Sequence, residues 1–193
     1  MHFTTRASTG VNPAMTLEND RELAQVLEER SRLGLVFARH AYGMRCWVDL
    51  FAARIPAADP EHKELVAGLV ADNARHMNLF RARARAHGVD PDAYVCPPEG
   101  EVIYERIAEM ESLDEAVGYA LGSLDHFEQL LAVYRAAADG DDATAIDRVR
   151  ADVARMREAL RPLATSASAR ARLDEAHELY RVRELAETAL YVG

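Results

Sequence analysis

Apolar residues recur along this chain every three or four positions, which is the spacing of one face of an α-helix. The first apolar stripe predicts a helix over residues 20–55, and Pro56 ends it. The second stripe predicts a helix that begins at Asp59-Pro60 and ends at Gly88. No segment alternates apolar and polar residues as a half-buried strand does, so the pattern indicates an all-α fold.

The rest of the chain predicts a second pair of helices. Residues 89–111 form a long, proline-rich connection, after which the segment Ser112-Leu-Asp-Glu115 makes a capping box that opens the third helix. A fourth helix runs from the turn at Gly140 to Pro162, and a further helix covers about residues 166–191. Because this last helix has a broad mixed face, we expect it to pack outside the others.

These elements predict one folded domain. We expect residues 1–14 to be a flexible tail, because they show no periodicity, and residues 15–193 to form a single helical domain. Two helical hairpins joined by the long connection would make a four-helix bundle over about residues 20–162, to which the last helix is added.

The acidic balance of the chain limits its partners. The sequence has 23 basic and 32 acidic residues, a formal net charge of −9, which argues against binding to nucleic acid or to an anionic membrane. No apolar run approaches the roughly 20 residues of a membrane span, and no secretory signal stands out, so we expect a cytoplasmic protein.

The tripeptide Ala-Arg-His occurs twice, ending at His40 and at His76, and each histidine lies on the apolar stripe of its predicted helix. Two such histidines on facing helices would form a polar pocket inside a bundle. That pocket could hold a metal ion or a small molecule, or it could be a hydrogen-bonded network that fixes the register of the helices.

The segment from Val70 to Tyr94, VADNARHMNLFRARARAHGVDPDAY, resembles the second-helix signature of rubrerythrin-type proteins in the ferritin-like superfamily. The resemblance implies a ferritin-like four-helix bundle and a homodimer. Bundles of that superfamily hold two iron or manganese ions, bound by a glutamate from each of two helices and by a Glu-x-x-His pair from each of the other two.

The resemblance assigns a place to the histidines of both Ala-Arg-His tripeptides. His76 matches the histidine of the second-helix pair, and Asn73 stands where the glutamate of that pair would be. His40 occupies the place of the first-helix carboxylate. Two positions that carry negative charge in the family are therefore uncharged in this chain.

The second half of the chain departs from the family pattern as well. The third-helix carboxylate corresponds to Asp125 or Glu128, and Asp152 and Arg155 replace the Glu-x-x-His pair of the fourth helix. A guanidinium cannot bind a metal ion, and fewer carboxylates offset less cationic charge. We therefore do not expect a standard di-iron centre. A single iron or manganese ion, with zinc a poorer candidate, is expected instead, and a chain without metal is the alternative.

Two functions from different classes follow. The first is a metal-dependent redox or oxygenase-type enzyme that acts on a small molecule, with His40 and His76 as catalytic residues. Its expected metal ligands are His40, His76, Asp125, Glu128 and Asp152, and its expected substrate-binding residues are Asn73, Arg155, Tyr119 and Tyr134. The alternative is a metal-free protein, either a binding or assembly module for a small ligand or a cofactorless enzyme that uses a core histidine as base.

Overall fold

The computed structural model describes residues 13–96 and 98–187, and every regular element within them is helical. The elements are α1 (Pro13–Val26), α2 (Arg30–Ala52), α3 (Pro60–Ala86), α4 (Pro98–Ala108), α5 (Leu113–Ala137), α6 (Gly140–Leu160), the 3₁₀ turn η1 (Arg161–Leu163) and α7 (Ala167–Glu187). The prediction of an all-α fold is confirmed for this part of the chain.

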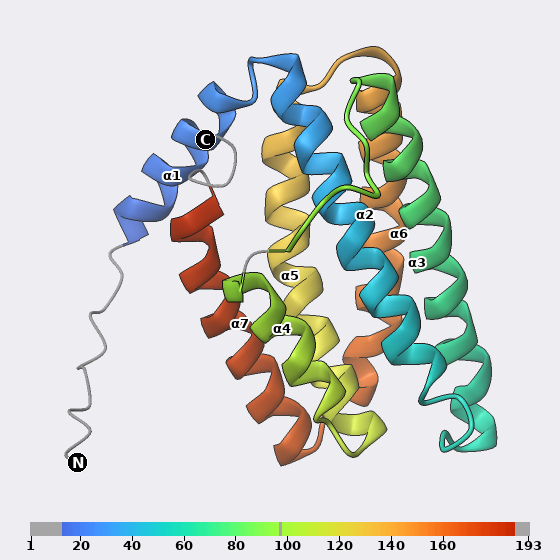
Figure 1. Ribbon diagram of the computed structural model, residues 1–193. Helices are drawn as coiled ribbons and strands as arrows, with labels where there is room; N and C mark the ends of the chain where they lie inside the picture. The colour runs from blue at the N-terminus through green and yellow to red at the C-terminus, as the bar shows by residue number, and fades with distance from the viewer. Residues whose placement is uncertain (1–12, 97, 188–193) are drawn as a thin grey trace.

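The long helices α2, α3, α5 and α6 lie side by side (Figure 1). α2 packs along α3, α5 packs along α6, and α3 also contacts α6. After α3 the chain runs back along the molecule through residues 87–112 and enters α5 at the end where α3 begins (Figure 1). As a result, α3 and α5 run in the same direction, whereas the helices within each pair are antiparallel.

The prediction of one continuous first helix is wrong. The sequence analysis predicts one helix over residues 20–55, whereas the structure has α1 and α2 with a turn at residues 27–29 between them. The turn lets α1 leave the axis of α2 and contact α5 and α7 instead. Residues 13 and 14, which we expected in the tail, belong to α1, and residues 1–12 lie outside the described part of the chain.

Glu29 forms the turn between α1 and α2. It has an extended backbone conformation, and its carboxylate accepts hydrogen bonds from the Ser31 hydroxyl (2.7 Å) and from Nε of Arg32 (3.0 Å). The sequence contains a signal for this break, because only polar residues stand between Leu27 and Leu33. A helix that continued through them would have no apolar stripe to bury.

Local signals place the ends of the other helices. The Ser112 hydroxyl accepts the backbone N–H of Glu115 (3.2 Å), and the Glu115 carboxylate accepts that of Ser112 (3.3 Å), so the predicted capping box is confirmed. Pro60 occupies the first turn of α3, where its missing N–H leaves no helical hydrogen bond unmade. Gly88 has a φ of 74°, the left-handed conformation that glycine adopts readily after a helix.

α7 packs along α5 at very close range, because α5 has glycine at two of the contact points. A Cβ on Gly118 would lie 2.0 Å from the carbonyl oxygen of Ala169, and a Cβ on Gly122 would lie 2.7 Å from that of Leu173. This packing brings Tyr180 of α7 into the core. Residues 188–191, which we predicted to continue this helix, lie outside the described residues.

Candidate functional site

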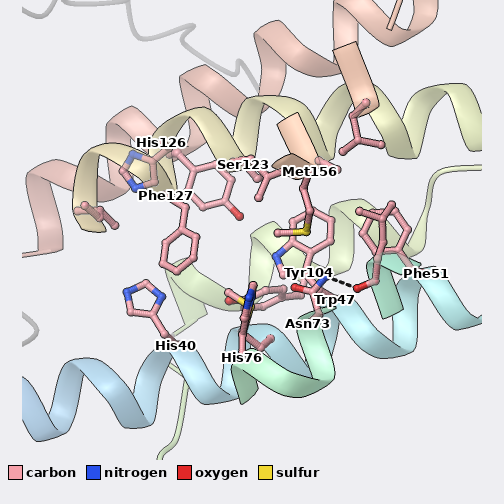
Figure 2. Close-up of a pocket in the computed structure, with 18 of the residues that line it drawn as sticks. His40, Trp47, Phe51, Asn73, His76, Tyr104, Ser123, His126, Phe127 and Met156 are labelled. Atoms are coloured by element: carbon pink, nitrogen blue, oxygen red, sulfur yellow. Dashed lines mark hydrogen bonds between the residues drawn. The ribbon is translucent and has the colours of Figure 1, made fainter. Parts of the chain in front are cut away.

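A cavity of about 60 Å³ lies in the core, lined by residues of α2, α3, α4, α5, α6 and α7 (Figure 2). Its apolar wall consists of aromatic, aliphatic and thioether side chains, chiefly Met44, Trp47, Phe51, Leu69, Phe127 and Met156. Its polar groups belong to Arg39, His40, Asn73, His76, Tyr104, Ser123, His126 and Tyr180. No aspartate or glutamate of the described chain lines this cavity.

His76 is the most deeply buried polar residue of the cavity wall. Its side chain is 2% exposed, and its Nε2 lies 3.0 Å from Oδ2 of Asp152 on α6. Its other ring nitrogen, Nδ1, is buried and has no hydrogen-bond partner. Burial lowers the pKa of His76, and the opposing effect of Asp152 does not cancel it, so the ring is neutral at pH 7.

Asp152 determines which nitrogen of His76 carries the proton. Burial alone would raise the pKa of Asp152, but hydrogen bonds from His76 and Arg155 hold that pKa below its usual value, so the carboxylate is ionised. An ionised carboxylate can only accept hydrogen bonds, so Nε2 of His76 must donate. Nδ1 is therefore left as a bare acceptor beside the cavity.

The Asp152 carboxylate connects His76 to the protein surface. Arg155 binds Asp152 and also Asp72 (2.8 Å), and Arg75 lies 3.9 Å from Asp152. The side chain of Arg155 is 55% exposed. The structure thus places Arg155 and Asp152 on the outer side of His76, and neither lines the cavity in which we expected them to bind substrate or metal.

Asn73 lies one turn before His76 on α3 and also lines the cavity. Its Nδ2 donates a hydrogen bond to the backbone carbonyl of Leu69 at 2.8 Å. Because a carbonyl only accepts, the amide nitrogen must point there, and the side-chain oxygen of Asn73 is left to face the other way. Asn73 therefore also presents an acceptor.

His40, from the first Ala-Arg-His copy, lies in the wall of the same cavity as His76 (Figure 2). Its Nε2 lies 3.0 Å from the Tyr134 hydroxyl, and its ring packs on Phe127 with the centroids 4.9 Å apart. Tyr134 contacts His40 without lining the cavity. Tyr119 does not line it either, because its hydroxyl donates to the carbonyl of Ile103 at 3.3 Å.

The two carboxylates expected from the third predicted helix bind cationic side chains of neighbouring helices. Arg157 of α6 contacts both Asp125 and Glu128, and its Nε lies 2.7 Å from Oδ1 of Asp125. His177 of α7 lies 3.1 Å from the other oxygen of Asp125. Neither Asp125 nor Glu128 lines the cavity.

The described residues do not assemble the ligands of a two-metal centre. Among them, only Asp59, Glu61 and His62, before and at the start of α3, bring three His, Cys, Asp or Glu ligand atoms within 4.8 Å of one another. None of the five expected ligands belongs to that group, and the cavity wall lacks the carboxylates that would offset two cations. The site does not fit the metal centre that the ferritin-like resemblance implies.

Sequence reasoning missed several residues that shape the cavity. Tyr104 reaches it from α4, within a connection whose pattern assigns it no core role. His126, for which the sequence leaves open a place in solvent or under the last helix, lies under α7, with its ring 4.9 Å from that of Tyr180. Trp47 could have been found, because it stands on the apolar stripe one turn after Met44 and is the only tryptophan of the chain.

Comparisons with protein-family models, with curated proteins and with solved structures found no match. None of the described helices has the length and apolar character needed to cross a bilayer. What the cavity can bind therefore follows from its own geometry and charge.

Proposed function

We propose that this protein is ferritin-like in architecture. The proposal is supported by two antiparallel helix pairs, α2 with α3 and α5 with α6, and by the connection that runs back along the molecule between them (Figure 1). The segment that resembles the rubrerythrin-type signature supplies the second half of α3 and the turn after it, and this segment carries His76.

Within that architecture, we propose that the core cavity binds a small molecule and that His76 accepts a hydrogen bond or a proton from it. The observation that carries the proposal is the buried Nδ1 of His76, which has no partner in the protein. A buried polar group without a partner costs about 1–3 kcal/mol of stability. A bound molecule that donates to Nδ1 would remove this penalty.

His76 and Asp152 are arranged for proton transfer. A neutral imidazole whose Nε2–H is held by a carboxylate can take up a proton on Nδ1, and the ionised carboxylate stabilises the imidazolium that forms. In this step an O–H or N–H bond of the bound molecule breaks and an N–H bond forms on His76. Because Asp152 is 14% exposed and binds the exposed Arg155, the charge that develops on His76 is compensated from the solvent side.

The volume of the cavity limits the size of the bound molecule. The space is about 60 Å³, whereas an apolar cavity that takes up benzene measures about 150 Å³. Scaling from benzene gives about two to three non-hydrogen atoms, and scaling from the roughly 10–15 Å³ that one water needs gives about four to six. We therefore take the cavity to fit a molecule of about three to five non-hydrogen atoms. At no more than about 1.5 kcal/mol for each such atom, a four-atom molecule gains at most about 6 kcal/mol, a dissociation constant of about 40 μM.

Trp47 supplies a direct readout of binding, because it lines the cavity and is the only tryptophan. The indole N–H resonance of Trp47 would be followed in isotope-labelled protein during titration with formamide, acetamide, acetone and propanol, which are neutral and of suitable size. We expect a saturable shift with at least one of these compounds. His76→Phe should weaken its binding about fivefold or more, whereas His62→Phe, at a histidine outside the cavity, should not.

Circular dichroism would verify that both variants keep the helix content of the native protein. The proposal fails if none of the compounds gives a saturable shift, or if both variants bind as the native protein does. Metal-dependent redox chemistry stays a prediction and is tested on the same proteins by anaerobic titration with Fe(II) and Mn(II). Stoichiometric metal binding that His40→Phe and His76→Phe both abolish would replace this proposal with a metalloenzyme.

A further inference from the structure

We infer that the cavity selects a neutral molecule that carries N–H or O–H donors, of the primary amide type, over molecules of the same size that are charged or lack donors. This inference rests on the proposed function, because it names the class of molecule that the cavity binds. It is carried by two acceptor atoms whose orientation the protein fixes, on Asn73 and on His76.

The two acceptors lie on one face of α3. Asn73 and His76 are three positions apart in the helix, so their Cβ atoms are about 5–6 Å from each other. The Leu69 carbonyl holds the amide nitrogen of Asn73, which leaves the amide oxygen as the available group. Asp152 holds the protonated nitrogen of His76 in the same manner, which leaves Nδ1. A molecule with two donors on one atom can serve both acceptors.

Trp47 adds a donor to the same wall. Its indole nitrogen can only donate a hydrogen bond, and Figure 2 shows the side chain beside those of Asn73 and His76. A primary amide presents two N–H donors and one carbonyl acceptor, which is the complement of two acceptors and one donor. A ketone of the same shape offers the carbonyl alone and leaves both acceptors on α3 unsatisfied.

The charges around the cavity disfavour ions. A cation would find no carboxylate among the described lining residues, and burial of a charge without an opposite charge beside it is strongly unfavourable. An anion has Arg39 among the lining residues, but it would place its charge against the two acceptors on α3 and would donate no hydrogen bond to them. We therefore expect a neutral molecule with donors to bind best.

Four compounds of nearly equal shape separate these properties: acetamide, acetone, acetate and acetamidinium. Acetamide is neutral and has N–H donors, whereas acetone is neutral and has none. Acetate is the anionic counterpart of acetamide, and acetamidinium is its cationic counterpart. The shift of the Trp47 indole N–H resonance during titration gives a dissociation constant for each. We expect acetamide to bind about tenfold more tightly than acetone, and both ions to bind more weakly than acetamide.

Two variants locate the source of the preference. Asn73→Leu removes one acceptor with little change of shape in a largely apolar wall, and it should reduce the preference for acetamide over acetone about threefold or more. Asn78→Leu is the matched control. Asn78 also belongs to α3 but is exposed and does not line the cavity, so this change should leave the preference unchanged.

Each result leads to a decision. Equal binding of acetamide and acetone would overturn the inference and leave the proposed binding function standing. Tightest binding of acetate or acetamidinium, or a full acetamide preference in Asn73→Leu, would also overturn it. If none of the four compounds nor formamide and propanol shifts the Trp47 resonance, the proposed binding function itself fails.

Discussion

Replacing Gly118 with alanine should destabilise this protein, although alanine is the better helix former. The added Cβ would lie 2.0 Å from the carbonyl oxygen of Ala169 and 2.7 Å from its carbonyl carbon. Both are backbone atoms, so no side-chain rotation can relieve the overlap. Because non-bonded heavy atoms attract best at about 3.5 Å, α7 would have to move more than about 1 Å away from α5 at this point.

The expected magnitude follows from two opposing effects. Overpacking of a core costs about 1–3 kcal/mol, and we take the upper value of about 3 kcal/mol because the backbone must move. Alanine in place of glycine within a helix gains about 1 kcal/mol. The net loss of unfolding free energy for Gly118→Ala is therefore about 2 kcal/mol, which lowers the melting temperature of a protein of this size by about 4–8 °C.

Gly68 provides the matched control for this prediction. It is an exposed glycine inside α3, and nothing lies within 4 Å of where its Cβ would be. Gly68→Ala should therefore stabilise the protein by up to about 1 kcal/mol. Urea denaturation followed by circular dichroism measures both variants. If Gly118→Ala is as stable as the native protein, the close backbone approach of α7 to α5 is refuted.

The remaining predictions concern buried ionisable groups. Burial lowers the pKa of His76 from its usual 6.5, so the unfolded chain binds more protons than the folded protein as the pH falls through about 6.5. The free energy of unfolding, measured by urea denaturation across this range, should decrease with falling pH, and less steeply in His76→Phe; an equal slope in the variant would contradict the role of His76. Asp142, buried, binds Arg83 (2.6 Å) and His87 (2.7 Å), so Asp142→Asn should cost about 2–4 kcal/mol in the same assay. Asp147→Asn, at an exposed carboxylate, should cost less than about 1 kcal/mol, and similar losses in both variants would show that burial is not what makes Asp142 important.

The helices themselves could be predicted because each buries a stripe of apolar residues and ends at a local signal. The capping box before α5 and the left-handed Gly88 after α3 depend only on neighbouring residues, so the sequence carries them in full. The break at Glu29 has neither glycine nor proline, and its only local signal is the polar run after Leu27. The direction that α1 takes away from α2 depends on its contacts with α5 and α7, which are distant in sequence.

The site could be predicted only in part for a related reason. The apolar stripe of α3 carries His76 and Asn73 in the sequence, and both line the cavity. The stripe of α5 could not decide the surroundings of Asp125 and Glu128, because their partner Arg157 lies on another helix. A carboxylate at the edge of an apolar stripe binds the cationic side chain that a neighbouring helix brings close to it. The spacing of apolar residues within one helix does not identify that partner.

Arg155 shows how the charge of one side chain can change what a set of helices binds. In the ferritin-like architecture that we propose, its place would belong to a metal-binding histidine, but its guanidinium is exposed and binds Asp72 and Asp152. The charge of Asp152 is thus offset by an arginine, and the carboxylate orients His76 from outside the cavity. Among the described residues the cavity wall has Asn73 and no carboxylate, so it offers no negative charge to hold a cation. The same arrangement of helices then favours a neutral molecule that donates hydrogen bonds, as we propose.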